Sequence, residues 1–374
     1  MKKVISFLLL LAVLASACFA LAEDTDDPVV AVVNGEELRQ SVYEPYETQY
    51  LSYYGSLGLD TTSETTIAYV SDMALTAAIQ DLLLSQDIKA QGCDVFTEEI
   101  EAWIVEAGTA AWEDALAQVG EYLRSTLEMD ADADMSEAAL QYADSLGVTA
   151  EDYIAVYRTQ YANQQYYEWL MKDCPITDEE VQAAYETRVE ESRSLYAGDV
   201  SAFETAMASG EETWYRPAGY RQVLQILLKA EGDTDEERLA SVQTIVDEIY
   251  ARLNAGEDFT ALIAEYGCDS AFDDESFYTT GYSVHRESIV WEDAFINAAF
   301  AEDMAAPGSW STQPFASTAG VHILYYLADA EEGPAELTDE VKEALSYTLY
   351  QERLQEKLQA RVEELSDAAT VEIK

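Results

Sequence analysis

The chain has 374 residues and carries 73 Asp and Glu against 20 Lys and Arg, so its formal net charge is −53 at pH 7. A surface this acidic repels nucleic acid phosphates and anionic lipid headgroups, so we expect no nucleic-acid partner. Acidic excess also occurs in disordered chains, but a hydrophobic fraction of 49% and 25 tyrosines predict a folded protein, long enough for two or three domains.

The first 22 residues have the pattern of a signal peptide. Lys2 and Lys3 precede an apolar run, and a stretch of small residues ends at Ala20-Leu21-Ala22. This pattern predicts an exported, extracytoplasmic protein, either secreted or held at the cell surface. Residues 14–18 also resemble a lipoprotein cleavage box, so lipidation of Cys18 stays open, and membrane attachment is expected only in that case. No later segment is expected to span a bilayer.

Cysteine and histidine usage gives little sign of metal or redox chemistry. Apart from Cys18 the chain has Cys93, Cys174 and Cys268, and an odd number cannot form a complete disulfide set. Whether Cys93 and Cys174 pair in an oxidising compartment is left open. The sequence has two histidines and no CxxC motif, so we expect neither a metal site nor a cofactor.

The segment from 23 to 215 is predicted to be mostly helical. Val29 to Val33 is a short β-rich run, which the turn pair Asn34-Gly35 ends. Tyrosines then recur at helical spacing, and we interpret this stripe as part of a core rather than as a grip for client peptides. The tyrosines are Tyr43, Tyr46, Tyr50 and Tyr53. Later helices are predicted at 67–90, from about Thr97, at 150–171 and from Asp178, where Thr177 and Glu180 form a capping box.

The segment from 216 to 329 has a different order of elements. The pattern predicts β-α-α-(β)-α-β-β, an α+β unit with a small antiparallel sheet rather than a parallel α/β fold. A Thr234–Glu237 capping box marks the start of its first helix. The expected elements are a strand at 220–229, helices at 234–254 and 259–266, a short strand near 281–282, a helix at 291–300, and strands around 310–315 and 321–327.

Four motifs in this segment resemble those of parvulin-type (PpiC or rotamase) peptidyl-prolyl isomerases. They are the stretch from Phe259 to Cys268-Asp269-Ser270, the run Phe295-Ile296-Asn297-Ala298-Ala299-Phe300, the turn Pro307-Gly308, and Gly320-Val321-His322-Ile323. Residues 29–36, 82–100 and 176–181 resemble parts of SurA-like and PrsA-like foldases. The resemblance implies a helical chaperone-like lobe into which a parvulin domain is inserted.

The resemblance also implies roles for individual residues. Phe295 would contact the prolyl ring beside Trp291, and Cys268 would lie beside the rotating amide. His322 would belong to a hydrogen-bonded centre together with Ser317. Gln225 stands where the family usually has a histidine, and its amide can donate and accept hydrogen bonds but cannot form a histidine pair. The catalytic set is therefore Gln225, Cys268 and His322, and the substrate-binding set is Trp291, Phe295 and Ser317. No role is predicted for His285.

Residues 330–374 are predicted to form a linker, a long amphipathic helix behind Thr338 and a final strand, and the resemblance implies that they pack on the N-terminal lobe. The expected divisions are therefore 1–22, 23–215, 216–329 and 330–374. Two functions stay open: a foldase that binds newly exported unfolded polypeptides and isomerises X-Pro bonds, and a holdase whose parvulin domain is not catalytic. A surface adhesin is a third interpretation, suggested only by acidity and tyrosines. The sequence leaves the oligomeric state open.

Overall fold

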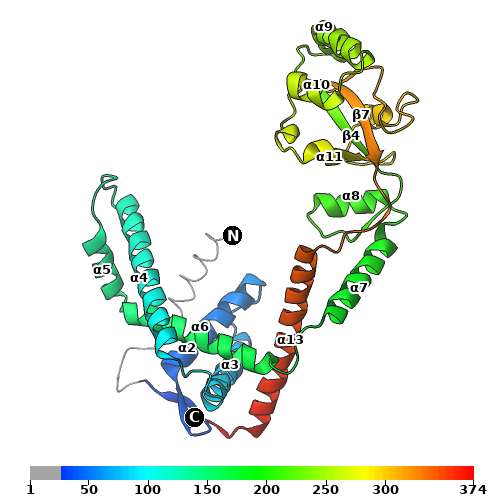
Figure 1. Ribbon diagram of the computed structural model, residues 1–374. Coiled ribbons are helices and arrows are strands. Elements are labelled where there is room, and N and C mark those ends of the chain that lie inside the picture. The colour runs from blue at the N-terminus through cyan, green and yellow to red at the C-terminus, as the bar shows by residue number, and fades with distance from the viewer. Residues whose placement is uncertain (1–26) are drawn as a thin grey trace. The chain divides into compact units, whose positions relative to one another are not determined.

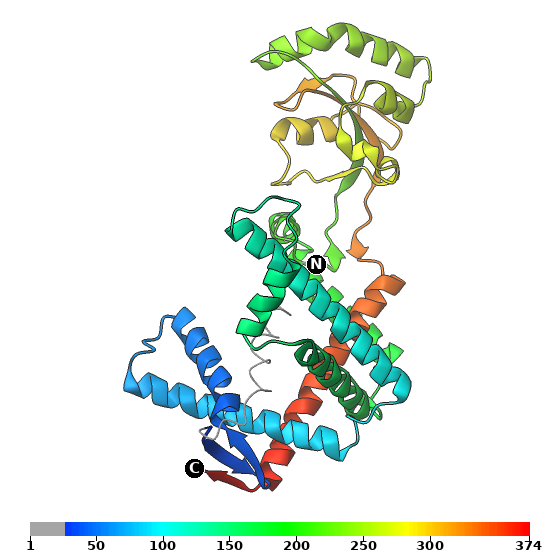
Figure 2. The same cartoon turned by 90° about the vertical axis from the view of Figure 1, so that its left-hand side faces the viewer.

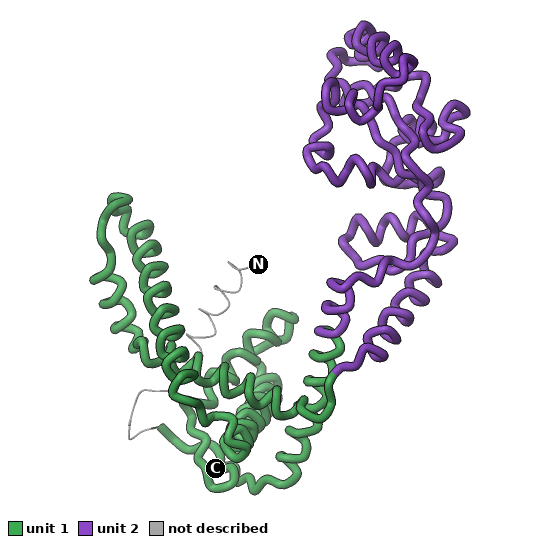
Figure 3. Tube along the Cα trace, in the orientation of Figure 1, with its two compact units in different colours: residues 1–175, 348–374 green, residues 176–347 purple. Residues whose placement is uncertain are grey.

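The computed structural model describes residues 27–374, so the predicted signal peptide and Cys18 lie outside the described residues. The described chain divides into two compact units (Figure 3). Unit 1 comprises residues 27–175 and 348–374, and unit 2 comprises residues 176–347. Unit 2 is therefore an insertion in the sequence of unit 1. The long helix α13 (Asp339–Ala368) contributes residues to both units.

A small antiparallel sheet in unit 1 joins the two ends of the described chain (Figure 1). β1 (Val29–Val33) pairs with β2 (Glu36–Arg39) on one edge and with β9 (Val371–Ile373) on the other. The turn residues Asn34 and Gly35 have φ values of 52° and 90°, which Asn and Gly tolerate best. Asn34 and Thr370 exchange two hydrogen bonds, so the turn that ends β1 also holds the start of β9.

The other elements of unit 1 are helices (Figures 1 and 2). Thr97 caps α4, and Thr149 with Asp152 forms a capping box for α6. α4 and α6 cross closely, because a Cβ added to Gly108 would lie 2.6 Å from the Cα of Ile154. The helices are α2 (Gln40–Ser56), α3 (Glu64–Ala90), α4 (Glu98–Thr126), α5 (Ser136–Ser145) and α6 (Ala150–Met171), together with the C-terminal part of α13.

The tyrosine stripe of α2 is a core feature at one end only. Tyr43 is buried, whereas Tyr46 and Tyr50 are half-buried and Tyr53 is 58% exposed. The Tyr46 hydroxyl donates to Asp81 of α3 at 2.6 Å. The expectation of a core stripe is therefore correct for Tyr43 and wrong for Tyr53, because α2 and α3 leave the far end of the helix uncovered.

A buried ion pair ties α13 to the helices of unit 1. The Asp87 carboxylate of α3 accepts two hydrogen bonds from Arg361 of α13, both near 2.7 Å, and a third from the Tyr166 hydroxyl of α6 at 2.5 Å. Asp87 is 5% exposed. Burial acts to raise the pKa of Asp87, but the hydrogen bonds from Arg361, Tyr166 and Gln91 outweigh it and lower the pKa to about 2. This stabilisation is present above pH 4 and is lost as the pH falls through about 2.

α3 is the one helix of residues 27–374 whose length and composition would suit a membrane span. Its mean hydropathy is 1.3 over the most apolar stretch, of which 22% is buried. The expectation that no later segment qualifies is therefore wrong on these two criteria. Within unit 1 the same helix buries Val70, Ala74 and Leu83 and carries Asp87 in its ion pair. Packing and pairing inside the unit thus account for the buried part of α3, and most of its apolar stretch is not buried.

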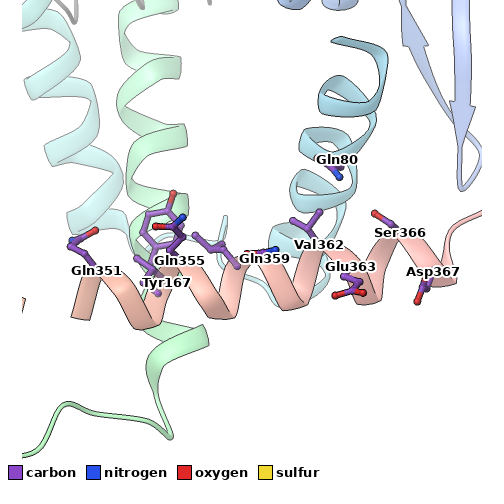
Figure 4. A pocket seen from close by; sticks show the side chains of 11 residues that line it. Gln80, Tyr167, Gln351, Gln355, Gln359, Val362, Glu363, Ser366 and Asp367 are labelled. Carbon is purple, nitrogen blue, oxygen red and sulfur yellow. The ribbon is translucent and has the colours of Figure 1, made fainter. Parts of the chain in front are cut away.

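A groove of about 830 Å³ runs along α13 in unit 1 (Figure 4). Gln351, Gln355 and Gln359 follow one another along α13 and line the groove with other residues of that helix, and Gln80 of α3 and Tyr167 of α6 line it as well. The groove belongs to the α3–α6–α13 contact. It shares no residue with the motifs of unit 2, so it is not the candidate catalytic site.

Unit 2 contains the segment with the parvulin-like motifs. The strand order in its sheet is β5-β4-β7-β6, and all three pairs are antiparallel. This arrangement confirms the predicted α+β class. The elements are β4 (Arg221–Leu228), α9 (Asp235–Asn254), α10 (Phe259–Tyr266), the 3₁₀ helix η2 (Ser270–Asp273), α11 (Phe277–Thr280), β5 (Tyr282–Val284), α12 (Asp293–Ala299), β6 (Phe315–Ala316) and β7 (Val321–Asp329).

The chain enters and leaves this segment side by side. β3 (Tyr215–Arg216) pairs with β8 (Gly333–Pro334), and α7 (Asp178–Tyr196) and α8 (Val200–Ala208) precede β3. The sequence did not predict α5, α8, β3 or β8. Two-residue strands carry no measurable period, and α8 follows α7 after only three residues, so neither feature stands out in the sequence.

The central strands β4 and β7 supply a core on each face of the sheet. Leu224, Ile226 and Ile323 pack with α9 and α10. Val223, Leu324 and Tyr326 pack with α12 on the other face. Because side chains alternate along a strand, Gln225 and His322 lie on the α12 face.

Two predicted boundaries differ from the structure. The helix expected at 291–300 spans Asp293–Ala299, so Trp291 lies in the preceding loop. The strand expected around 310–315 is reduced to Phe315–Ala316, and Trp310 makes an isolated bridge to Tyr325. The open question of a Cys93–Cys174 disulfide is answered in this structure, where both thiols are free.

Replacing Arg361 with methionine is expected to lower the free energy of unfolding of unit 1 by about 3–5 kcal/mol, because the buried Asp87 carboxylate loses its cation. Urea denaturation followed by circular dichroism and tryptophan fluorescence measures the change. Arg39→Met is the matched control, since Arg39 pairs with Glu37 where both side chains are about half exposed, and its cost should stay below about 1 kcal/mol. Equal losses in the two variants would contradict this role for Arg361.

Candidate functional site

Gln225 and His322 are brought together by the pairing of β4 with β7. In this register Gln225 lies opposite Leu324, and Leu227 lies opposite His322. Gln225 and His322 are therefore diagonal neighbours on one face of the sheet. Each residue is 5% exposed. Gly320 makes the tight approach before β7 possible, because its φ is 149° and an added Cβ would lie 2.2 Å from the Leu228 carbonyl oxygen.

A chain of hydrogen bonds runs through these buried groups. His322 Nδ1 lies 2.7 Å from Gln225 Oε1, and Gln225 Nε2 donates to Asp269 Oδ2 at 2.6 Å. At the other end His322 Nε2 lies 2.7 Å from Ser317 Oγ. The Tyr282 hydroxyl also donates to Asp269 Oδ2, at 2.7 Å. We call these five residues, Ser317, His322, Gln225, Asp269 and Tyr282, the polar chain.

The carboxylate of Asp269 fixes the direction of every bond in the polar chain. A carboxylate only accepts hydrogen bonds, so the Gln225 amide must turn its nitrogen toward Asp269. The Gln225 oxygen then accepts, which requires the proton of His322 on Nδ1. Nε2 is left as an acceptor for the Ser317 hydroxyl. The charge of Asp269 thus selects the tautomer of His322, which lies two hydrogen bonds away through Gln225.

Burial keeps His322 neutral. Loss of hydration lowers the pKa of His322 to about 4, although the charge of Asp269 acts in the opposite direction. The neutral ring has one donor and one acceptor, and the polar chain uses both. His322 is therefore a fixed dipolar link at neutral pH and not a cation.

Asp269, not Cys268, occupies the position beside Gln225. Cys268 is exposed, and its backbone N–H donates to the Leu227 carbonyl. Asp269 Oδ1 accepts from the Ala271 N–H, so the same carboxylate starts η2 and ends the polar chain. The sequence contained a signal for Asp269, because the family motif has either cysteine or aspartate at this point and this chain has Cys268 followed by Asp269. Tyr282 had no such signal, because it comes from the short strand β5.

Aromatic rings cover the polar chain on the α12 side. Phe315 stacks on His322 with 4.7 Å between ring centroids, and Phe295 meets the same imidazole edge-on at 6.0 Å. Trp291 stacks on Phe295 with centroids 4.4 Å apart and planes at 15°. Phe295 is 4% exposed. The structure thus brings five of the six predicted site residues together, and Cys268 lies outside their contacts.

His285 and metal ligands take no part in this arrangement. His285 Nδ1 accepts from the Glu287 N–H, inside its own loop. Within residues 27–374, no group of three or more His, Cys, Asp and Glu side chains is placed to hold a metal ion.

Comparison with known proteins finds solved structures of low sequence identity to this chain. No family model matches the sequence, and no curated protein matches it. A SurA-like chaperone of Campylobacter jejuni is 18% identical, with 93% of this chain and 100% of that one covered and a TM-score of 0.31. PrsA of Bacillus cereus, described as a peptidylprolyl isomerase, is 16% identical, with 91% and 92% covered and a TM-score of 0.24. PrsA of Bacillus subtilis is 16% identical, with 93% and 95% covered and a TM-score of 0.23.

This chain resembles SurA-like and PrsA-like proteins. The similarity is at 16–18% sequence identity.

The protonation of His322 can be measured directly. Imidazole NMR of the intact protein should show His322 in the Nδ1–H form with a pKa near 4. His285→Gln identifies the signals, because the sequence has two histidines. A pKa near 6.5 for His322, or the Nε2–H tautomer, would contradict the bond directions deduced for the polar chain.

The same pKa makes the stability of unit 2 depend on pH. The folded-state pKa of His322 lies below the 6.5 of an unfolded chain, so the unfolded state binds the proton more readily between pH 6.5 and 4. The free energy of unfolding should therefore fall by up to about 3 kcal/mol as the pH decreases through that window. His322→Gln removes this component while the carboxylates still titrate. Identical pH slopes for the variant and the wild type would contradict it.

Proposed function

We propose that this protein is an extracytoplasmic foldase that binds newly exported, unfolded chains and isomerises X-Pro peptide bonds at the site in unit 2. The observation that carries the proposal is the polar chain lying against the rings of Phe295 and Phe315. The export context rests on the signal-peptide pattern of residues 1–22, and the client class rests on the resemblance to SurA-like and PrsA-like foldases.

The reaction needs no covalent step and no cofactor. Rotation about an X-Pro bond crosses a barrier of about 18–20 kcal/mol, because the twisted amide loses its resonance. An apolar site favours the twisted amide, since the planar form has the larger charge separation and is the better hydrated of the two. Phe295 and Phe315 supply such surroundings on the α12 face.

The polar chain has a positioning role in this reaction. Its donors are mostly used internally: Ser317 to His322, His322 to Gln225, and Gln225 and Tyr282 to Asp269. The Gln225 side chain also interacts with the Tyr282 hydroxyl and is 5% exposed, so its amide is engaged inside the polar chain. The resulting array is rigid before substrate arrives, which is the condition under which fixed dipoles favour one state of the substrate over another. Gln225 thus links His322 to Asp269 in the place of the family's histidine.

Asp269 and Cys268 give a matched test of the catalytic assignment. Asp269→Asn is expected to lower the isomerisation rate about tenfold, because it weakens two hydrogen bonds to a charged acceptor. Cys268→Ser should stay within about twofold of the wild type, since its side chain is exposed beside the polar chain. The measurement is the rate of a proline-limited refolding reaction at saturating protein. A wild-type rate at the uncatalysed baseline would reject catalysis.

A non-catalytic holdase is the second candidate, and the covering of Phe295 favours it. A ring that is 4% exposed cannot meet a prolyl ring unless its cover moves. The holdase predicts that Phe295→Ala leaves the suppression of client aggregation unchanged within about twofold while the wild type shows no isomerisation. Light scattering of an aggregating client measures the suppression. Isomerisation by the wild type and its loss in Phe295→Ala would reject this candidate.

A further inference from the structure

We propose that Glu204 of α8, which lies outside the parvulin-like segment, is a positioning residue that holds the Trp291 indole over Phe295. It thereby sets the fraction of molecules whose prolyl pocket is open. This inference rests on the proposed function and concerns the regulation of the same site.

The Trp291 indole is the cover that a prolyl ring must displace. It stacks on Phe295 at 4.4 Å and meets Tyr282 edge-on at 5.2 Å. Its indole N–H donates to the Ser283 carbonyl of β5 at 2.9 Å. Trp291 belongs to the loop between β5 and α12, so the geometry of that loop decides where the indole lies.

Glu204 anchors this loop two and three residues before Trp291. Its Oε2 accepts from the Ile289 N–H at 2.7 Å and from the Ser288 hydroxyl at 2.9 Å. Two residues of extended chain reach about 7 Å, so fixing Ile289 restricts the positions open to Trp291. The side chains of Ile289 and Val290 are more than half exposed, so they add little packing that would hold this part of the loop.

Glu204 is a buried carboxylate with a complete set of neutral donors. It is 4% exposed, and its Oε1 accepts from the Tyr220 hydroxyl at 3.0 Å. Burial, together with the charge of Glu204, raises the pKa of Tyr220, so this hydroxyl stays protonated and donates. A buried charge is retained only where hydrogen bonds compensate it, so the loop donors and the carboxylate hold one another in place. The polar chain contains no atom of this anchor.

The anchor also borders an open groove of about 920 Å³ in unit 2. Glu204, Tyr220 and Val290 line it, together with residues of α8 and of the β8 segment. A ligand in this groove would touch the anchor without touching the polar chain. Displacement of the Ser288 and Ile289 bonds would then release Trp291.

The test compares Glu204→Gln and Ser288→Ala with Tyr220→Phe as the matched control. Ser288→Ala removes one loop hydrogen bond, and Glu204→Gln weakens both because a neutral amide oxygen replaces the charged acceptor. Tyr220→Phe removes a hydrogen bond of similar length from the other carboxylate oxygen. The protein is labelled with 5-fluorotryptophan, and Trp291→Phe assigns the fluorine signal among the six tryptophans. Glu204→Gln and Ser288→Ala should shift the Trp291 signal and increase its broadening by a soluble paramagnetic agent. Tyr220→Phe should resemble the wild type.

The kinetic readout separates positioning from a general loss of structure. Release of the cover should lower KM about three- to tenfold with kcat within about twofold, because the competent fraction rises and the bound state is unchanged. An unchanged Trp291 signal in both anchor variants, or an equal change in Tyr220→Phe, would overturn the role of Glu204. If Glu204→Gln does not fold, Ser288→Ala decides. A shifted Trp291 signal with no isomerisation in any variant would reject the proposed function and leave the positioning role supported.

Discussion

The antiparallel pairing of β4 with β7 is the constraint on which the site depends. These two strands open and close the parvulin-like segment, and they are the central pair of its sheet. Their register places Gln225 and His322 on one face, and the same pairing supplies apolar side chains to the cores on both faces. A shift of one residue would turn the site residues of the shifted strand to the other face. The chemistry of the site and the stability of the segment therefore rest on the same hydrogen bonds.

Within that frame, one carboxylate organises the polar groups. Asp269 accepts hydrogen bonds from Gln225 and Tyr282. The orientation that this imposes on the Gln225 amide in turn sets which atom donates in the Gln225–His322 and His322–Ser317 hydrogen bonds. Replacing a histidine by glutamine at position 225 keeps a donor and an acceptor in line, so the array remains complete. The glutamine has no titration near neutral pH, and burial removes that of His322. The arrangement should therefore keep the same hydrogen-bond directions across the neutral pH range.

The elements of unit 2 that precede and follow the parvulin-like segment also contact it. The chain passes into the parvulin-like segment through β3 and out through β8, which pair with each other. Helix α8, which comes just before this entry, reaches the loop that carries Trp291 through Glu204. A residue outside the segment can thus influence the cover of its apolar pocket. In unit 1, the pairing of β1 with β9 and the Asp87–Arg361 ion pair hold the returning end of the chain.

The sequence by itself determined the α+β class, most helix starts, and the resemblance to SurA-like and PrsA-like proteins. Capping boxes at Thr177 and Thr234 and the period of the apolar residues are local signals, and local hydrogen bonds and burial decide them. Only the tertiary structure showed that Asp269 contacts Gln225 and that Cys268 is exposed, because this depends on which side chain faces Gln225 on another strand. It also decided that Tyr282 joins the site, that Trp291 covers Phe295, and that Glu204 holds the loop. Apart from the stack of Trp291 on Phe295, which lies four residues further on, these contacts join residues that are 13 to 85 positions apart in the chain, and no local pattern encodes them.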